Sequence, residues 1–201
     1  MTPDDGETRT AQDKAELRTL LRDRRARYVA GLPASTRGLA FRVLPSPVLR
    51  RLPAGGTIAL YRAAGAEAPT ESIADQLDSL GYRLALPRID EHRIMVFAAW
   101  DNDLILVPGP FRALQPDAQA NPVTPDAILA PLVGFDTALN RLGQGGGYYD
   151  RAFAAHPAAL RIGLAWSAQA VERLPAEAHD LPLDIIVTET AILERDEETA
   201  R

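Results

Sequence analysis

The fold of this chain is decided by the stretch from Ala127 to His156, which reads AILAPLVGFDTALNRLGQGGGYYDRAFAAH. It begins with an apolar run, Ala127 to Asp136, that favours a buried strand, and it ends with a helical pattern from Tyr148 to His156. Glycines at positions 143, 145, 146 and 147 lie between the two. A strand, a glycine-rich loop and a helix N-terminus in this order are typical of the phosphate-binding edge of an open α/β sheet.

The residues around these glycines are suited to a nucleotide. Glycines allow positive φ and let successive backbone N–H groups point at one anion. Arg141 can hold phosphate oxygens with its planar fork, Tyr148 and Tyr149 can pack on a heterocycle, and Asp150 offers a hard oxygen to Mg²⁺. The segment is not a Walker A motif, because no Lys-Ser/Thr pair follows the last glycine. A flexible surface loop is the simpler interpretation, and it stays open at this point.

The first half of the chain predicts helices followed by a βαβ unit. Helical spacing and proline breaks predict one helix over 10–30 and a second that begins after Pro33 and is broken around Pro45 and Pro47. Short apolar runs predict strands over 57–62 and 83–88, joined by a loop through Glu67 and a helix capped by Thr70. Two strands joined in this way lie parallel in one sheet.

Beyond this unit, the pattern predicts strands over 95–100, 161–166 and 184–188, a short helix over 167–173 and a long irregular loop over 107–124. We therefore expect an α/β fold: a three-layer sandwich with a mostly parallel open sheet and helices on both faces. We expect one domain over residues 1–201, with frayed ends at 1–9 and 194–201.

Composition excludes several classes of protein. The chain has 201 residues, 46% of them hydrophobic, and a net charge of −5, so a global basic footprint for nucleic acid is missing. It has no cysteine, which excludes disulfides, thiolate metal sites and a cysteine nucleophile. No apolar stretch is long enough to span a bilayer, and the first residues lack a signal segment. We expect a cytoplasmic monomer that binds a small molecule, and no nucleic acid or membrane.

Lys14 is the only lysine among the 22 basic residues. A bias towards arginine explains this without any function, but such a bias spares a lysine where a compact ammonium is needed. Lys14, Arg18, Arg22 and Arg25 recur at helical spacing, so one helix face presents four cations. The alternative interpretation is that these four side chains extend into solvent and bind nothing.

Taken together, four segments resemble the 5-formyltetrahydrofolate cyclo-ligase family. They are LVGFD (132–136), RLGQGGGYYDR (141–151), IGLAW (162–166) and HDLPLDIIVTE (179–189). The resemblance extends from about Lys14 to Glu189. It implies a NagB/RpiA/CoA transferase-like fold and the ATP- and Mg²⁺-dependent closure of 5-formyltetrahydrofolate, with or without a polyglutamate tail, to 5,10-methenyltetrahydrofolate.

The resemblance also implies roles for individual residues. It places Lys14, Arg18 and Arg141 at the phosphates as catalytic cations and Asp150 and Asp180 at Mg²⁺. It gives the ATP loop as Arg141, Leu142, Gly143, Gln144, Gly145, Gly146, Gly147, Tyr148 and Tyr149, and the folate pocket as Arg62, Glu67, Phe111 and Tyr149.

The residues alone leave simpler interpretations open. Asp150 suits the first turn of any helix, Asp180 suits a turn, Glu67 suits a solvated loop, and Phe111 suits a loop anchor. His179 is expected to be structural.

The chain also departs from the family at two places. The family commonly has Glu-Pro at 115–116 and an aromatic or basic residue at 144, whereas Gln115 and Gln144 stand here. A sugar-phosphate isomerase or CoA-transferase-like enzyme, and a non-catalytic nucleotide-binding or RNA-associated module, are the other classes. The first needs a dedicated base or nucleophile that the sequence does not single out, and the second is expected to lose one of the two aspartates or to gain a basic surface.

Overall fold

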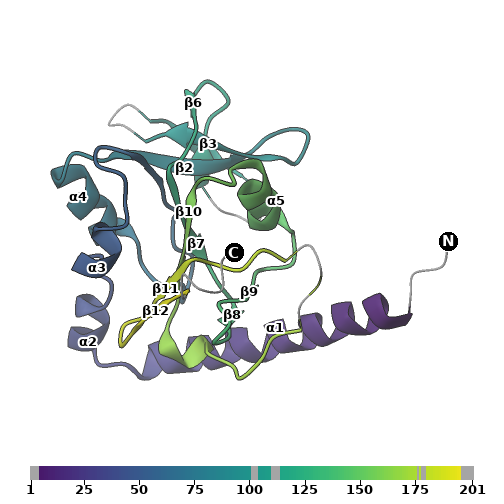
Figure 1. The fold of residues 1–201 in the computed structure, drawn as a ribbon. Helices are drawn as coiled ribbons and strands as arrows, with labels where there is room; N and C mark the ends of the chain where they lie inside the picture. The colour runs from purple at the N-terminus through teal and green to yellow at the C-terminus, as the bar shows by residue number, and fades with distance from the viewer. Residues whose placement is uncertain (1–4, 101–103, 110–113, 176, 178–179, 196–201) are drawn as a thin grey trace.

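Eight strands form one sheet in the order β12-β11-β10-β7-β1-β2-β3-β6 (Figure 1). The computed structural model describes residues 5–100, 104–109, 114–175, 177 and 180–195. The strands from β11 to β2 run parallel, and antiparallel strands flank them at both edges. Their bounds are β1 (Thr57–Ala59), β2 (Arg83–Ile89), β3 (Met95–Ala99), β6 (Pro122–Val123), β7 (Ala127–Pro131), β10 (Leu160–Leu164), β11 (Ile185–Val187) and β12 (Ile192–Glu194).

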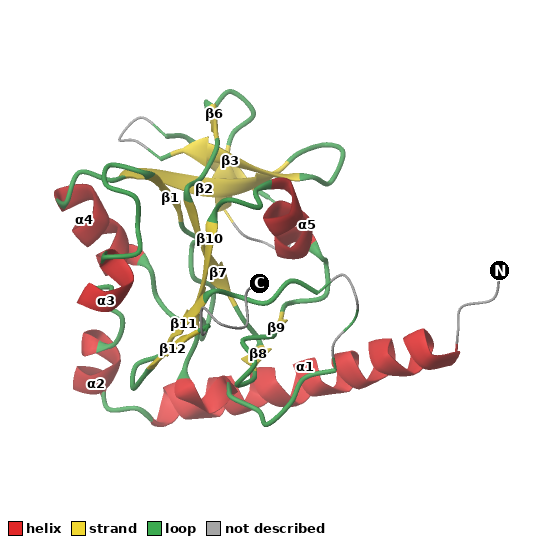
Figure 2. Cartoon of the chain, viewed as in Figure 1, coloured by secondary structure: helices red, strands yellow, loops and turns green. Residues whose placement is uncertain are grey.

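Helices cover both faces of this sheet (Figure 2). α3 (Ser46–Leu49) and α4 (Glu71–Ser79) pack on one face, α5 (Tyr148–Ala155) packs on the other, and α2 (Ala34–Leu39) lies next to α3. α1 (Asp5–Gly31) crosses the end of the sheet. The predicted α/β fold with a mostly parallel sheet and helices on both faces is confirmed, whereas its superfamily label, the single-domain boundaries and the frayed ends stay predictions.

The central strands are apolar throughout because both of their faces are buried. In β7, Leu129 belongs to the core on the α4 side, whereas Ile128 and Ala130 belong to the core on the α5 side. β11 alternates in the same way, with Ile186 on the α5 side. Such two-sided burial produces continuous hydrophobic runs in parallel sheets, which is why the sequence pattern located these strands.

Residues 107–124 were expected to be an irregular loop, and this prediction was wrong for part of the segment. β4 (Leu106–Pro108) and β5 (Leu114–Pro116) form a hairpin, and β6 pairs with β3. The side-chain amide of Gln115 donates to the carbonyl of Ile89 (3.2 Å) and accepts from its N–H (3.1 Å), so it continues the sheet as a peptide group would. Because the side chain of Gln115 makes the hydrogen bonds that a neighbouring strand would make, the sequence shows no alternation of apolar residues that would predict a strand here.

Other predicted elements differ in their ends. The strand expected to run to Asp136 stops at Pro131 and is followed by a hairpin of β8 (Gly134–Phe135) and β9 (Arg141–Leu142). The helix over 167–173 is only a short 3₁₀ turn, η2 (Ser167–Gln169). Pro45 and Pro47 lie at the start of α3, where the missing N–H groups cost nothing. Thr70 is the N-cap residue of α4 as predicted, but its hydroxyl donates to the carbonyl of Tyr61 (2.5 Å) and makes no capping hydrogen bond.

α1 is held against the sheet by contacts along its length. Leu21 packs with Val133 and Leu142 beyond the carboxyl end of β7. Tyr28 donates to the carboxylate of Glu189 (2.6 Å), which also accepts from the backbone N–H (2.8 Å) and the hydroxyl of Ser167. These contacts fix the register of the helix that carries the cations. Within the described residues, no helix has the length and apolarity required to cross a membrane.

The Glu189 contacts predict a pH-dependent contribution to stability. Burial raises the pKa of Glu189, but hydrogen bonds from Ser167 and Tyr28 outweigh it and lower the pKa below the ordinary 4.5. The contribution is therefore complete above the unfolded-state pKa and is lost as pH falls through the lower folded-state value. We expect Glu189→Gln to reduce Tm by about 2–4 °C at pH 7, equivalent to about 1 kcal/mol. The difference from the parent should shrink below pH 4.5; a constant difference in thermal melts from pH 3 to 8 would contradict this.

Candidate active site

A cleft of about 900 Å³ opens at the carboxyl ends of β1, β2 and β7. α1, the glycine loop (residues 143–147), the start of α5 and strand β5 form its walls. Ligands of open α/β sheets bind at this edge. The cleft is lined by nearly all residues that the sequence indicated: Lys14, Arg18, Arg62, Glu67, Arg141, Leu142, Gly143, Gln144, Gly145, Gly146, Gly147, Tyr148, Tyr149, Asp150 and Asp180. The remaining one, Phe111, lies outside the described residues, as does His179.

The glycine loop approaches α1 closely. Gly145 has a φ of +101° and Gly147 a φ of +63°, in the region that favours glycine. Arg18 donates from Nε to the carbonyl of Gly143 (2.9 Å), and a Cβ added at Gly145 would lie 3.4 Å from the Arg18 guanidinium carbon. Burial lowers the pKa of Arg18, and the neighbouring charge of Arg22 lowers it further. An anion between the loop and α1 would relieve this repulsion between cations.

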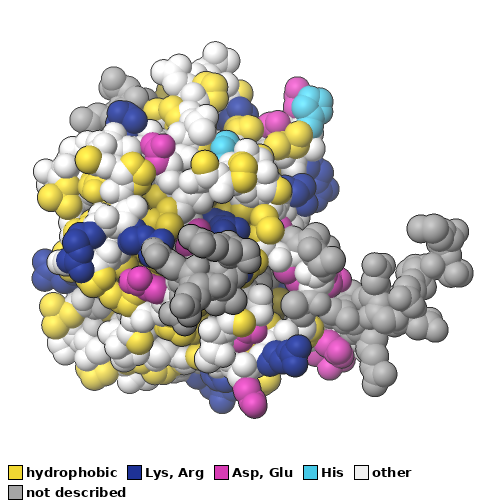
Figure 3. Space-filling model, viewed as in Figure 1, with side chains coloured by type: hydrophobic (Ala, Val, Ile, Leu, Met, Phe, Trp, Pro, Cys, Tyr) yellow, Lys and Arg dark blue, Asp and Glu magenta, His cyan; other side chains and the backbone are white. Residues whose placement is uncertain are grey.

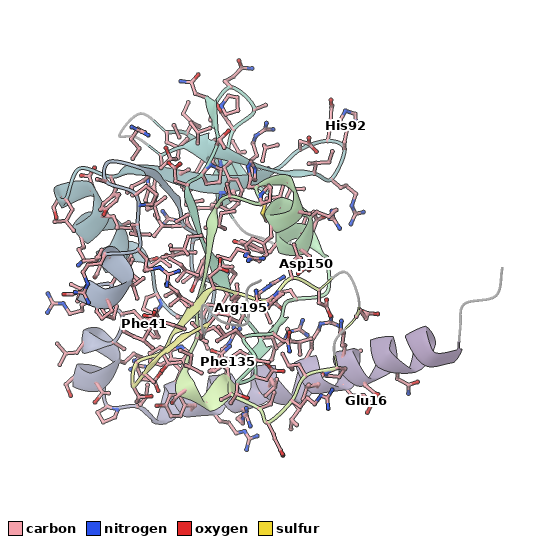
Figure 4. All side chains as sticks on the ribbon, viewed as in Figure 1. Glu16, Phe41, His92, Phe135, Asp150 and Arg195 are labelled. Atoms are coloured by element: carbon pink, nitrogen blue, oxygen red, sulfur yellow. The ribbon has the colours of Figure 1, made fainter. Side chains whose placement is uncertain are left out.

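Arg141 is a buried cation on the cleft wall. Only 4% of its side chain is exposed, and its guanidinium donates to Asp150 at 2.7 Å. The guanidinium carbon lies 5.5 Å from the ring centre of Tyr149 and 5.7 Å from that of Phe153. Its Nε has no hydrogen-bond partner among the described residues. Asp150 comes from the first turn of α5 (Figure 4), so this helix fixes the partner of the cation.

The turn before Arg141 is built around Asp136, a residue that is 2% exposed. One carboxylate oxygen of Asp136 accepts from the backbone N–H groups of Ala138 and Asn140 at 3.0 Å. The other accepts from the Asn140 amide and from the N–H of Leu174, both at 3.0 Å. The turn is thereby closed on itself and tied to the backbone of Leu174, and it leads directly into β9 and Arg141.

Lys14 lies between two carboxylates. Its ammonium is 2.5 Å from Glu177 and 2.6 Å from Asp180, and only 8% of its side chain is exposed. Interpretation of Lys14 as a solvated helix charge was therefore wrong. Asp180 also accepts from the backbone N–H of Glu177 (2.7 Å), so it closes a turn as well as pairing with the cation. Glu177 belongs to the site, and the sequence analysis missed it.

Glu67 lies in the loop that follows β1, with 11% of its side chain exposed. One oxygen accepts from the backbone N–H of Ala64 (3.0 Å), and the other lies 3.9 Å from Arg25. Its charge adds to the effect of burial in raising the pKa of the phenols of Tyr61 and Tyr149, so both stay protonated at neutral pH. Glu67 is therefore not a freely solvated loop charge but a largely buried carboxylate that faces the cleft.

The acidic residues of the cleft suit a cation that binds mainly to phosphate. No group of three or more metal-ligating side chains occurs within the described part of the chain. Asp150 and Asp180 each offer hard oxygens, and each pairs with a cation, Arg141 or Lys14. Mg²⁺ commonly binds through one or two carboxylates, water and the phosphates of a nucleotide. The donor set therefore fits Mg²⁺ held jointly with a nucleotide, and not a metal held by protein alone.

Comparison with known proteins decides the family. A family model described as the 5-formyltetrahydrofolate cyclo-ligase family matches residues 10–189. The chain belongs to this family. It is 32% identical over 146 residues to the 5-formyltetrahydrofolate cyclo-ligase of Escherichia coli K12, covering 69% of this chain and 80% of that relative. It is 29% identical over 188 residues to the enzyme of the same name from Mycolicibacterium smegmatis, covering 88% of this chain and 94% of the relative.

A solved structure agrees with this assignment. The NMR structure of the 5,10-methenyltetrahydrofolate synthetase of Aquifex aeolicus has a TM-score of 0.72 and 29% identity to this chain, covering 91% of this chain and 93% of that one. The cyclo-ligase resemblance drawn from the four sequence segments is confirmed. The roles of individual residues in this cyclo-ligase family member stay predictions.

Proposed function

We propose that this protein closes 5-formyltetrahydrofolate to 5,10-methenyltetrahydrofolate while ATP is converted to ADP and phosphate, with Mg²⁺ present. The observation that carries the proposal is that one cleft has two halves suited to two ligands. The phosphate half is the glycine loop with Lys14, Arg18 and Arg141 and with Asp150 and Asp180 beside these cations; Glu67 marks the other half. The sequence-based expectations of a monomer in the cytoplasm, acting on folates with or without a polyglutamate tail, remain part of the proposal.

The surface supports a small-molecule substrate. Figure 3 shows one face of the molecule, on which Lys and Arg side chains are interspersed with acidic and apolar ones and form no broad basic area. The net charge is −5. Both features are unlike the basic footprint of a nucleic-acid-binding protein.

The chemistry needs positioning more than an enzyme nucleophile. A formamide carbon is a poor electrophile, and its oxygen leaves poorly. If the formyl oxygen attacks the γ-phosphorus of ATP, the bond to ADP breaks and an iminium phosphate forms. N10 of the same folate then attacks the formyl carbon and loses its proton, and phosphate departs with the electron pair of the C–O bond. The product is 5,10-methenyltetrahydrofolate. Because no enzyme nucleophile takes part in these steps, the chain does not need a cysteine for them.

The side chains of the cleft fit these steps. Lys14, Arg18 and Arg141 would offset charge on the transferring phosphoryl group, and the loop N–H groups would orient its oxygens. Mg²⁺ would neutralise phosphate charge, with Asp150 and Asp180 as its protein oxygens. Glu67 would accept hydrogen bonds from the amino and N–H edge of the pterin, and the walls around Tyr149 would keep water from the reactive intermediate.

The Mg²⁺ assignment predicts a shift in metal dependence. We expect Asp150→Asn and Asp180→Asn each to raise the Mg²⁺ concentration for half-maximal turnover by roughly tenfold, because each variant removes one anionic oxygen. The exposed Asp78 of α4 lies outside the cleft, so Asp78→Asn is the control. Turnover is measured across a Mg²⁺ titration at saturating ATP. If both cleft variants titrate like the parent, these aspartates are structural.

The folate assignment predicts a selective loss of affinity. We expect Glu67→Gln to weaken 5-formyltetrahydrofolate binding by roughly 10- to 100-fold, because a charged acceptor is replaced by a neutral amide. ATP affinity should change by less than about twofold. Glu71→Gln is a matched control, because Glu71 also accepts from a nearby backbone N–H and lies outside the cleft. Equal calorimetric losses for both ligands would instead indicate a general structural role for Glu67.

The direct test of the proposed function is the absorbance of 5,10-methenyltetrahydrofolate formed from 5-formyltetrahydrofolate by the purified protein. The product should accumulate only when ATP and Mg²⁺ are both present. Formation of product without nucleotide, or none with it, would refute the proposal.

A further inference from the structure

The side chain of Gln144 bridges the two halves of the cleft. Arg22 donates to its Oε1 from two nitrogens, at 3.0 and 2.7 Å. A guanidinium has donors only, so this contact fixes the orientation of the amide and turns its NH₂ group away from Arg22. The NH₂ group donates to Glu67 at 3.3 Å. A residue of the glycine loop therefore contacts the carboxylate of Glu67, which belongs to the loop that follows β1.

This contact engages the Glu67 oxygen that faces Arg25. The other oxygen already accepts from the N–H of Ala64. Both oxygens of a largely buried carboxylate are thus approached by donors, and the Gln144 amide is the exposed side chain among them, whereas Arg25 is buried and Ala64 donates only through its backbone. A ligand that presents its own donors to Glu67 must displace the amide, because the amide occupies the approach from the glycine loop.

The guanidinium of Arg22, which holds the Gln144 amide in place, is a group that an incoming phosphate would attract strongly. Arg22 lines the cleft beside the glycine loop, and its contact with Gln144 joins a cation to a neutral amide. Hydrogen bonds from a guanidinium to phosphate oxygens are charge-assisted on both sides and roughly twice as strong. The like charge of Arg18 nearby adds to the attraction for an anion.

We propose that Gln144 is a positioning residue that covers Glu67 until a nucleoside triphosphate draws Arg22 away and releases the amide. The inference rests on the proposed function and adds an order to it. Nucleotide binding uncovers the acceptor for the donor edge of the folate, so the nucleotide raises folate affinity, and folate raises nucleotide affinity by the same factor.

The test measures folate affinity with and without nucleotide. Calorimetry would give the Kd of 5-formyltetrahydrofolate for the parent, for Gln144→Met and for Gln144→Ala, alone and at saturating imido analogue of ATP with Mg²⁺. Methionine keeps the length of the side chain without its hydrogen bonds, and alanine removes the side chain. Gln119→Met is the control, because Gln119 is an exposed glutamine outside this cleft.

We expect the nucleotide to lower the Kd of the parent and of Gln119→Met by about three- to tenfold, because the displaced hydrogen bond is long and exposed and is worth no more than an ordinary one. Both Gln144 variants should bind folate about three- to tenfold more tightly than the parent without nucleotide and equally well with it. Three results would each overturn the inference. The nucleotide could leave the folate Kd of the parent unchanged. The Gln144 variants could show the same ratio of folate Kd values, without and with nucleotide, as the parent, or they could bind folate more weakly than the parent under both conditions. Failure of the proposed function is a separate result, seen as a parent that binds no 5-formyltetrahydrofolate or forms no product.

Discussion

Replacing Lys14 with methionine should lower kcat by about 100-fold or more, the usual cost of removing one charge-stabilising donor from a transition state. The ammonium lies with 8% of its side chain exposed in the cleft that Arg18 and Arg141 also line, so it is placed to meet phosphate oxygens. Lys14→Arg should recover only part of the activity, because a planar fork does not fit a site made for a compact charge. Folate affinity should fall much less than the rate of phosphoryl transfer in single-turnover experiments.

The carboxylates around Lys14 require a second variant. Without the ammonium, Glu177 and Asp180 would repel ATP, and this alone could slow the reaction. Lys14→Met combined with Glu177→Gln removes one of the two charges. If the double variant recovers parental turnover, Lys14 acts only by neutralising acids and the phosphate assignment fails. Arg27→Met is the helix control, because Arg27 is an exposed cation of α1 outside the cleft.

Gly145→Val should weaken ATP binding by at least about tenfold. A β-branched residue is strained at a φ of +101°, and its side chain would press on Arg18, so the loop must move from the arrangement that faces the cleft. Gly81 is a matched glycine, since its φ is +80°, it ends α4, and it lies outside the cleft. Gly81→Val should cost similar strain and lower Tm comparably while leaving ATP affinity unchanged.

The comparison of these two valine variants separates folding from binding. If a folded Gly145→Val protein binds ATP with the parental affinity in calorimetry, the glycine loop is not the phosphate site. If Gly81→Val loses ATP affinity to the same degree, the loss reflects general destabilisation.

Local patterns in the sequence predicted the elements whose structure depends mainly on neighbouring residues. The strand at Ala127, the glycine loop and α5 follow from an apolar run, four residues without side chains and helical spacing. The same patterns could not show that Lys14 meets Glu177, because 163 residues separate them and nothing in the spacing of either indicates the other. Glu177 follows a proline-containing loop without periodicity, so it carried no signal of its own.

The sequence also failed to predict the places where a polar side chain hydrogen-bonds to backbone groups that are distant in the sequence or in a turn. Gln115 pairs with the backbone of Ile89, and Asp136 closes the turn that positions Arg141. Gln169 does similar work by donating to the carbonyl of Leu132 (2.6 Å). Each of these residues is as common in loops as in buried turns, and only the three-dimensional neighbourhood distinguishes the two. The prediction of an irregular loop over 107–124 was therefore the least accurate part of the predicted fold.

In the proposed mechanism, the cleft transfers a phosphoryl group from ATP to the formyl oxygen of the folate. The most direct measurement is mass spectrometry of the inorganic phosphate released from 5-formyltetrahydrofolate that carries a heavy oxygen isotope in its formyl group. We expect one heavy oxygen in each phosphate released with the methenyl product. Phosphate of ordinary mass, with the heavy oxygen recovered in water, would contradict it.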